Sequence, residues 1–126
     1  MRILIIEDAA DVAASMQMLL EIDGHEVAIA VDGPEGIQLA RAFEPHVVFC
    51  DIGLPGMDGY EVARAMQADA ELRGIFRVAI SGYALPGDVA RAGAAGFHRH
   101  IAKPANPEDI RGALLEVDGP HGWSAR

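Results

Sequence analysis

Five side chains that can bind a metal ion or a phosphoryl group lie at the ends of apolar runs in this 126-residue chain. They are Glu7, Asp8, Asp51, Ser81 and Lys103. Three carboxylates brought together repel one another, so their ionised forms need a cation nearby. Mg²⁺ fits this need because it prefers oxygen ligands in octahedral geometry and usually keeps several waters. The residue types therefore indicate a magnesium site, provided that the fold brings them together.

The same residues also suit phosphoryl transfer. A phosphoryl group bound to the metal would still carry charge, which Lys103 could neutralise while the Ser81 hydroxyl hydrogen-bonds another oxygen. One carboxylate must then act as the nucleophile. Asp51 is the candidate, because it stands alone after a central apolar run and leads into a loop that contains Gly53 and Pro55.

The elements that must position these residues alternate along the chain. Strands are predicted at 2–6, 25–30, 46–50, 76–81 and 97–102, and helices at 9–22, from Asp32 to Phe43, at 59–69, at 86–95 and from Asn106 onward. This alternation predicts a parallel sheet, in which 2–6 and 46–50 are central because both are almost entirely apolar. In such a sheet, ligands bind beyond the carboxyl ends of the strands. The five side chains are therefore expected at one edge.

Two helices carry more specific expectations. In helix 9–22, the face with Val12, Met16, Leu19 and Leu20 is predicted to contact the core. The helix at 86–95 is expected to be the least stable, because Gly87 and Gly93 each disfavour a helix interior by roughly 1 kcal/mol relative to alanine. Residues 1–117 are predicted to form one domain, and 118–126, which lack periodicity, a flexible tail or the start of a linker.

Composition excludes several classes of function. The net charge is −9 and the basic residues are scattered, so direct binding to nucleic acid is not expected. The apolar runs are too short to cross a membrane. Cys50 is the single cysteine, which excludes an internal disulfide and suits a reducing cytoplasm. The chain is therefore predicted to be cytoplasmic, with a buried and inert thiol.

Four segments together carry a resemblance to a known family. They are ILIIED at 3–8, DIGLPGMDG at 51–59, ISGYA at 80–84 and AGFHRHIAKP at 95–104. In this order, they resemble the receiver domains of response regulators in two-component signalling. The resemblance implies an α/β, flavodoxin-like, doubly wound fold with five parallel strands in the order 2-1-3-4-5 and five helices.

The resemblance also implies a role for each residue of the site. Asp51 would accept a phosphoryl group from a histidine kinase or a histidine phosphotransfer protein. Asp8, Asp51 and the backbone carbonyl of Gly53 would coordinate Mg²⁺, with Mn²⁺ as a substitute, and Glu7 would act through water. Lys103 would pair with the phosphoryl group and precede a cis proline, while Ser81 would turn inward.

The family further implies a switch that dephosphorylates itself and is not a turnover enzyme. The signal would pass to an effector protein or a fused domain, or through a phosphorylation-dependent homodimer. On helix 9–22, Ala10, Ala14, Gln17 and Met18 lie off the core face and could form the apolar patch on which a phosphodonor docks, although alanine there also simply favours helix.

Two positions depart from the family pattern. Many members have an aromatic switch residue three positions before the lysine, where this chain has His100. Its switching role is left open. Gly53, two positions after Asp51, offers no side chain to control an attacking water. His98 and His100 are interpreted as surface histidines on one strand face, because two histidines without a third ligand make a poor metal site.

Three rival functions remain to be separated. A receiver-like interaction domain that is never phosphorylated predicts a broken acidic pocket, whereas all five pocket residues are present. A phosphohydrolase with an aspartate nucleophile normally needs a second aspartate at the position of Gly53. A flavodoxin-like flavin binder needs a phosphate-cradling loop after the first strand, and the acidic sequence there disfavours it. The phosphorylated signalling module is the preferred hypothesis.

Overall fold

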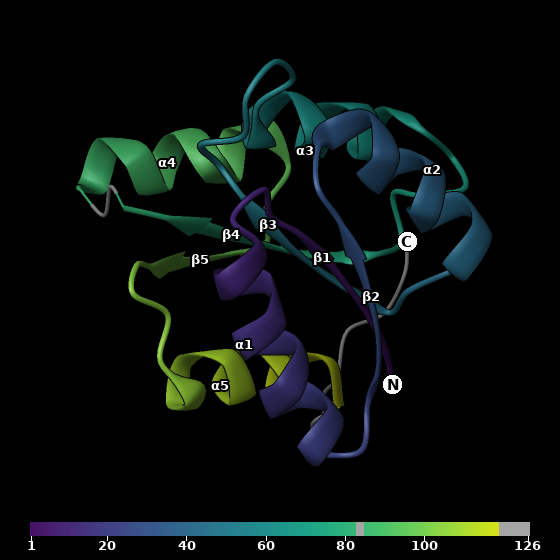
Figure 1. Ribbon diagram of the computed structural model, residues 1–126. Helices are drawn as coiled ribbons and strands as arrows, with labels where there is room; N and C mark the ends of the chain where they lie inside the picture. The colour runs from purple at the N-terminus through teal and green to yellow at the C-terminus, as the bar shows by residue number, and fades with distance from the viewer. Residues whose placement is uncertain (83–84, 119–126) are drawn as a thin grey trace.

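The computed structural model describes residues 1–82 and 85–118, and these contain five strands and five helices (Figure 1). The elements are β1 (Arg2–Ile6), α1 (Ala10–Ile22), β2 (Glu26–Ala30), α2 (Gly33–Phe43), β3 (Val47–Asp51), α3 (Gly59–Ala68), β4 (Phe76–Ser81), α4 (Pro86–Ala95), β5 (Arg99–Ala102) and α5 (Pro107–Asp118). The strands form one parallel sheet in the order β2-β1-β3-β4-β5. This order confirms the predicted fold class.

Helices cover both faces of the sheet. Figure 1 shows α1 and α5 on one face and α2, α3 and α4 on the other. Successive side chains of β1 point to opposite faces of the sheet. Ile3 and Ile5 belong to the core cluster under α1 and α5, whereas Leu4 and Ile6 belong to the cluster under α2, α3 and α4. All five residues of β3 are buried. Burial on both faces explains why the central strands read as continuous apolar runs.

Local signals fix where three of the helices begin. Side-chain oxygens accept backbone N–H bonds at each start: Asp32 from Glu35 at 2.9 Å, Asp58 from Glu61 at 2.9 Å and Asn106 from Asp109 at 2.8 Å. Each cap of this kind stabilises a helix by about 1 kcal/mol. These contacts fix the residue at which each helix begins. They thereby limit the conformations of the loops at the carboxyl ends of the strands.

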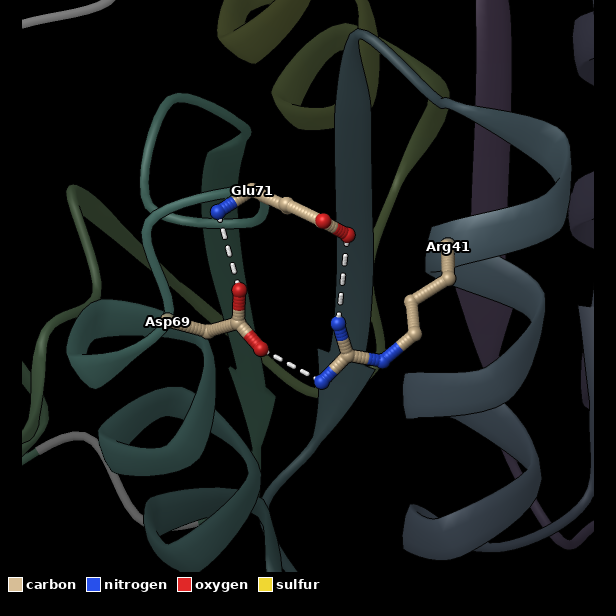
Figure 2. A network of polar contacts seen from close by, with 3 residues as sticks. All are labelled: Arg41, Asp69 and Glu71. Atoms are coloured by element: carbon tan, nitrogen blue, oxygen red, sulfur yellow. Dashed lines mark hydrogen bonds and ion pairs between the residues drawn. The ribbon is translucent and has the colours of Figure 1, made fainter.

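A polar network joins α2 to the segment between α3 and β4. Figure 2 shows the guanidinium of Arg41 reaching the carboxylates of both Asp69 and Glu71. The Arg41 Nη1 to Glu71 Oε2 distance is 3.4 Å, and the Glu71 N–H donates to Asp69 Oδ1 at 2.8 Å. The N–H of Glu71, followed by Arg41, lowers the pKa of Asp69. Because these groups are exposed to solvent, the network orients the loop more than it stabilises the fold.

The predicted core face of α1 is partly wrong. Val12 is 43% exposed, and the buried residues of the helix are Ala13, Met16 and Leu20. A buried stripe centred on these three residues leaves Val12 at its edge, because successive helical residues are turned by about 100°. Leu19, at the same edge, is partly buried against the core. The prediction failed because the spacing of apolar residues in this helix is compatible with a core face centred on either side of Met16.

The ends of the other elements lie within two residues of the predicted positions, and α4 forms over the whole of 86–95. Residues 119–126 of the predicted tail lie outside the described residues, so the division at 117 stays a prediction. Among the helices that the structure describes, none is long and apolar enough to cross a membrane.

Candidate functional site

The carboxyl ends of the strands bring the predicted acidic residues together. One carboxylate oxygen from each of Glu7, Asp8 and Asp51 lies within 4.8 Å of the other two. Glu7 and Asp51 are buried, whereas Asp8 is exposed. The three come from the ends of β1 and β3, which are hydrogen-bonded neighbours. The parallel register therefore places acidic residues that are far apart in sequence around one point that solvent can reach.

The backbone around Asp51 is held closely. The Ile52 N–H donates to the Ile80 carbonyl at 3.0 Å, and the Gly59 N–H donates to the Ile52 carbonyl at 3.0 Å. A Cβ at Gly59 would lie only 2.6 Å from the Asp51 carbonyl oxygen. The first turn of α3 can therefore lie against the end of β3 only because residue 59 is glycine.

Lys103 lies across the acidic residues. Its N–H donates to the Ser81 carbonyl at 2.8 Å, and the bond to Pro104 is cis, as the family resemblance implied. The ammonium lies 3.1 Å from Asp51 Oδ1 and 3.7 Å from Glu7 Oε1. Burial opposes the charge on Lys103, but the hydrogen bond with Asp51 and the charges of both acids raise its pKa. Lys103 is thus a fixed cation at the phosphoacceptor candidate.

Glu7 carries the strongest electrostatic signature of the site. Burial raises its pKa from 4.5 to about 7, with further contributions from the hydrogen bond and the charge of Asp51. Lys103 opposes this shift without cancelling it. The site therefore lacks enough positive charge to hold all three carboxylates ionised at neutral pH. A hard divalent cation would supply that charge, and three neighbouring carboxylates, of which that of Asp8 is exposed, are a donor set that suits Mg²⁺.

At Gly53, the structure shows a contact that the sequence did not predict. The Gly53 N–H donates to Asp51 Oδ1 at 3.0 Å, and a Cβ at this position would lie 3.7 Å from the same oxygen. The amide therefore orients the carboxylate. Coordination by the Gly53 carbonyl stays a prediction.

Ser81 and His100 lie on the neighbouring strands β4 and β5. Ser81 is the last residue of β4 and is buried. His100 lies opposite Ala79 in the sheet, and Ala79 belongs to the cluster that also contains Ala92 and Ala95 of α4. Its Nε2 is buried and has no hydrogen-bond partner among the described residues. The interpretation of His100 as a surface histidine therefore holds only in part, because the residue is partly exposed while α4 covers the face of β5 on which its Nε2 lies.

The interpretation of His98 holds only in part. His98 is exposed but precedes β5, so it does not share a strand face with His100 as predicted. Its Nδ1 accepts the Arg77 N–H at 2.9 Å. Cys50 is buried as expected, and burial raises the pKa of its thiol. Neither residue contributes a ligand to the acidic site.

Two features of the structure escaped sequence reasoning. The first is an apolar cavity of about 330 Å³ beside Asp51. Its lining comes from β1, α1, the ends of β3 and β4, and the segment after β5: Ile5, Ile6, Glu7, Val12, Met16, Phe49, Asp51, Ile80, Lys103, Pro104 and Ala105. No local pattern signals such a cavity, because it arises where separate elements meet. The second is Arg77, a fully buried cation whose only sequence signal is its place inside an apolar strand.

A shallow groove runs along the exposed side of α1. Asp11, Ala14, Ser15, Met18, Leu19 and Ile22 line it. Ala14 and Met18 belong to the predicted docking patch, whereas Gln17 is partly buried and lies outside the groove. Met18 is 65% and Ile22 76% exposed. The apolar surface on α1 therefore extends further toward the C-terminal end of the helix than predicted.

Comparison with known proteins identifies the arrangement. The family model of the response regulator receiver domain matches residues 3–115. The chain belongs to this family. As a receiver domain it is a module of two-component signalling, a switch and not a classical enzyme. Curated relatives agree: the chain is 31% identical to the protein PilH of Pseudomonas aeruginosa over 109 residues, covering 86% of this chain and 90% of PilH.

A second curated relative is the polar-differentiation response regulator DivK of Brucella ovis. It is 33% identical to this receiver domain over 102 residues, which cover 81% of this chain and 83% of DivK. Among solved structures, a CheY-like receiver domain protein from Methanospirillum hungatei has a TM-score of 0.83 at 30% identity, with 91% of this chain and 90% of that chain covered.

A further solved structure bears on the metal. The receiver domain of a sensor histidine kinase from Pseudomonas aeruginosa has a TM-score of 0.83 at 26% identity, covering 91% of this chain and 94% of that one. It was crystallised with a magnesium ion coordinated in its active-site cleft. Relatives of this receiver domain thus include both separate regulators and receiver domains of kinases.

Proposed function

We propose that this receiver domain accepts a phosphoryl group on Asp51 from a phosphohistidine of a histidine kinase or a histidine phosphotransfer protein. The observation that carries the proposal is the position of the Asp51 carboxylate. It is buried at the carboxyl edge, within 4.8 Å of acidic oxygens and 3.1 Å from the Lys103 ammonium. A nucleophile, an acidic metal-binding set and a cation thus share one small volume.

The transfer requires positioning and charge stabilisation more than proton chemistry. A carboxylate oxygen of Asp51 attacks the phosphorus, the phosphorus–nitrogen bond of the donor breaks, and the leaving imidazole takes a proton from water. Lys103 neutralises the phosphoryl oxygens in place of the carboxylates that it contacts here. Asp8, Asp51 and the Gly53 carbonyl would hold Mg²⁺, with Glu7 acting through water, and Mn²⁺ could substitute. The bound ion supplies charge neutralisation at the phosphoryl oxygens.

The proposed switch involves Ser81, His100 and α4. After phosphorylation, the Ser81 hydroxyl turns toward a phosphoryl oxygen and α4 repacks against the sheet. His100 lies beneath α4, and its buried Nε2 has no hydrogen-bond partner among the described residues. A shift of α4 would expose this nitrogen to water and remove the cost of leaving it unpaired. Water then hydrolyses the acyl phosphate and resets the switch. With glycine at position 53, no side chain there directs this water.

The groove on α1 is the proposed docking site for the phosphodonor. Its apolar residues lie on the helix that follows Glu7 and Asp8, and Val12 of the same helix lines the cavity beside Asp51. The output then goes to an effector protein or a fused domain, or through a phosphorylation-dependent homodimer. The receiver domain is proposed to span 1–117, with 118–126 as a tail or linker.

A small-molecule phosphodonor tests the proposal without a partner protein. Incubation with acetyl phosphate and Mg²⁺ is expected to add one phosphoryl group to the intact protein, as measured by mass spectrometry. Asp51→Asn is expected to abolish the addition, whereas Asp58→Asn, which alters an acid at the start of α3, is expected to retain it. A wild-type protein that stays unmodified would instead favour the interaction-only alternative.

A further inference from the structure

Three histidines lie just before strands, at the edge of the sheet opposite the phosphoacceptor. His25 precedes β2, His46 precedes β3 and His98 precedes β5. His46 Nδ1 accepts the N–H of Arg2, the first residue of β1, at 2.9 Å, and His98 Nδ1 accepts the N–H of Arg77 in β4 at 2.9 Å. His25 Nδ1 lies 3.0 Å from the nitrogen of Met1. In each case, a ring bridges two neighbouring strands at their N-terminal ends.

These bonds constrain the state of the rings. At the end of a parallel sheet, the first N–H groups of a strand lack part of the ladder and need another acceptor. An imidazole nitrogen accepts only when it carries no proton, so His46 and His98 must be neutral with hydrogen on Nε2. Protonation would turn each acceptor into a donor that faces another donor. Both strand contacts at this edge therefore depend on uncharged histidine.

The surroundings of His98 oppose a positive charge. Its ring stacks on Phe76, with ring centroids 5.1 Å apart. Arg77 is fully buried and donates to the carbonyls of Gly96, Arg73 and Ile75 and to the side-chain oxygen of Gln67, so no carboxylate is among its described partners. The neighbouring Arg99 is paired with Glu116 of α5. Burial, followed by the charge of Arg77, lowers the pKa of His98 to about 4.

His46 has a similar cationic neighbour. Arg2 provides the N–H that His46 accepts, and its Nε donates to the carbonyls of Phe43 and Glu44 at the end of α2. On the other side, the His46 carbonyl accepts the Phe76 N–H at 3.1 Å. The ring therefore lies where β1, β3 and β4 begin. Among the residues that contact Arg2 or His46 here, the acidic one is Glu44, which is exposed.

We infer that His46 and His98 form a proton-sensitive latch that closes the N-terminal edge of the sheet only while both rings are neutral. Acidification opens the latch at the β1–β3 and β4–β5 contacts. The Arg77 guanidinium connects this edge to α4, because it binds the carbonyl of Gly96, the residue that ends the helix. The latch therefore couples proton concentration to the helix that carries the proposed output, without involving the phosphoacceptor.

Asparagine provides a matched test, because its side-chain oxygen takes the place of Nδ1 and accepts a hydrogen bond but does not titrate. The double variant His46→Asn with His98→Asn is compared with wild type by urea unfolding from pH 7.5 to pH 4.5. Wild type is expected to lose stability as pH falls below about 6.5, because unfolded His98 takes up a proton at a pH where the folded ring, whose pKa is lowered to about 4, stays neutral. The double variant is expected to lose less.

Two further measurements make the result decisive. Nitrogen chemical shifts of the wild-type rings at pH 7 are expected to show hydrogen on Nε2 at both histidines, and those of His98 are expected to stay unchanged down to about pH 5. The double variant is expected to accept phosphate on Asp51 at pH 7.5 as wild type does, which separates this test from that of the proposed function. Equal acid sensitivity of wild type and double variant, or a proton on Nδ1 at pH 7, would overturn the latch.

Discussion

Magnesium binding to this receiver domain is predicted to weaken sharply as the solution becomes acidic. The pKa of Glu7 is about 7, raised mainly by burial and also by Asp51. The metal must bind the ionised carboxylate cluster, so protons compete with it. At pH 8 about nine-tenths of Glu7 is ionised, and at pH 6 about one-tenth, so the dissociation constant for Mg²⁺ should rise roughly tenfold over this interval. Binding at pH 7 should release about half a proton.

Isothermal titration calorimetry in two buffers with different ionisation enthalpies measures both the affinity and the released protons. Glu7→Gln is the decisive variant, because it keeps the shape of the side chain and removes its titration. It should bind Mg²⁺ more weakly than wild type at pH 8, with nearly the same affinity at pH 6 and pH 8. Glu21→Gln, at an exposed position near the end of α1, is the matched control and should behave like wild type.

The reasoning fails if wild type binds Mg²⁺ equally well at pH 6 and pH 8 and releases no proton. It also fails if Glu7→Gln retains the pH dependence, since the titrating group would then be another residue. Either result would mean that protons on Glu7 do not compete with the metal ion between pH 6 and pH 8.

Three other substitutions test how the fold supports the site. Arg77→Leu should lower the free energy of unfolding by about 3–5 kcal/mol, because several buried carbonyls lose their donor; a loss below about 1 kcal/mol in urea unfolding would refute the importance assigned to this cation. Gly59→Ala should reduce phosphorylation by acetyl phosphate, because its Cβ would lie 2.6 Å from the Asp51 carbonyl oxygen. Gly87→Ala in α4, where a Cβ meets nothing within 4 Å, is the control and should phosphorylate normally. Lys103→Ala should still bind Mg²⁺ but should fail to change the hydrogen exchange of α4 after phosphorylation; loss of metal binding would contradict its assigned role.

The parts of the fold that depend on neighbours in sequence could be predicted. The helices predicted at 59–69 and from Asn106 onward begin within one residue of the predicted positions, where Asp58 and Asn106 accept the capping bonds. The convergence of Asp8, Asp51 and Lys103 followed from topology, because parallel strands end at a common edge. The strand order came from the family resemblance and not from the pattern of the strands.

The parts that depend on how separate elements meet could not be predicted. Val12 is exposed because the core face of α1 is rotated toward Ala13, a choice that apolar periodicity leaves open. His100 has a buried Nε2 because α4 covers its face of β5. The hydrogen bonds of Arg77 reach backbone carbonyls in two segments, the connection before β4 and the end of α4. Which backbone carbonyls meet this side chain depends on the fold and cannot be read from residue types. The residues of the acidic site could therefore be predicted from the sequence, whereas the packing and hydrogen bonds of Val12, His100 and Arg77 could not.

The measurement that tests the central claim most directly is the location of the phosphoryl group. After incubation with acetyl phosphate and Mg²⁺, borohydride reduces an aspartyl phosphate to homoserine, and peptide mass spectrometry locates the altered residue. The arrangement of Glu7, Asp8 and Lys103 around one carboxylate predicts homoserine at position 51 and at no other aspartate. Phosphoprotein that yields homoserine elsewhere, or none at all, would contradict the assignment of Asp51 as the phosphoacceptor.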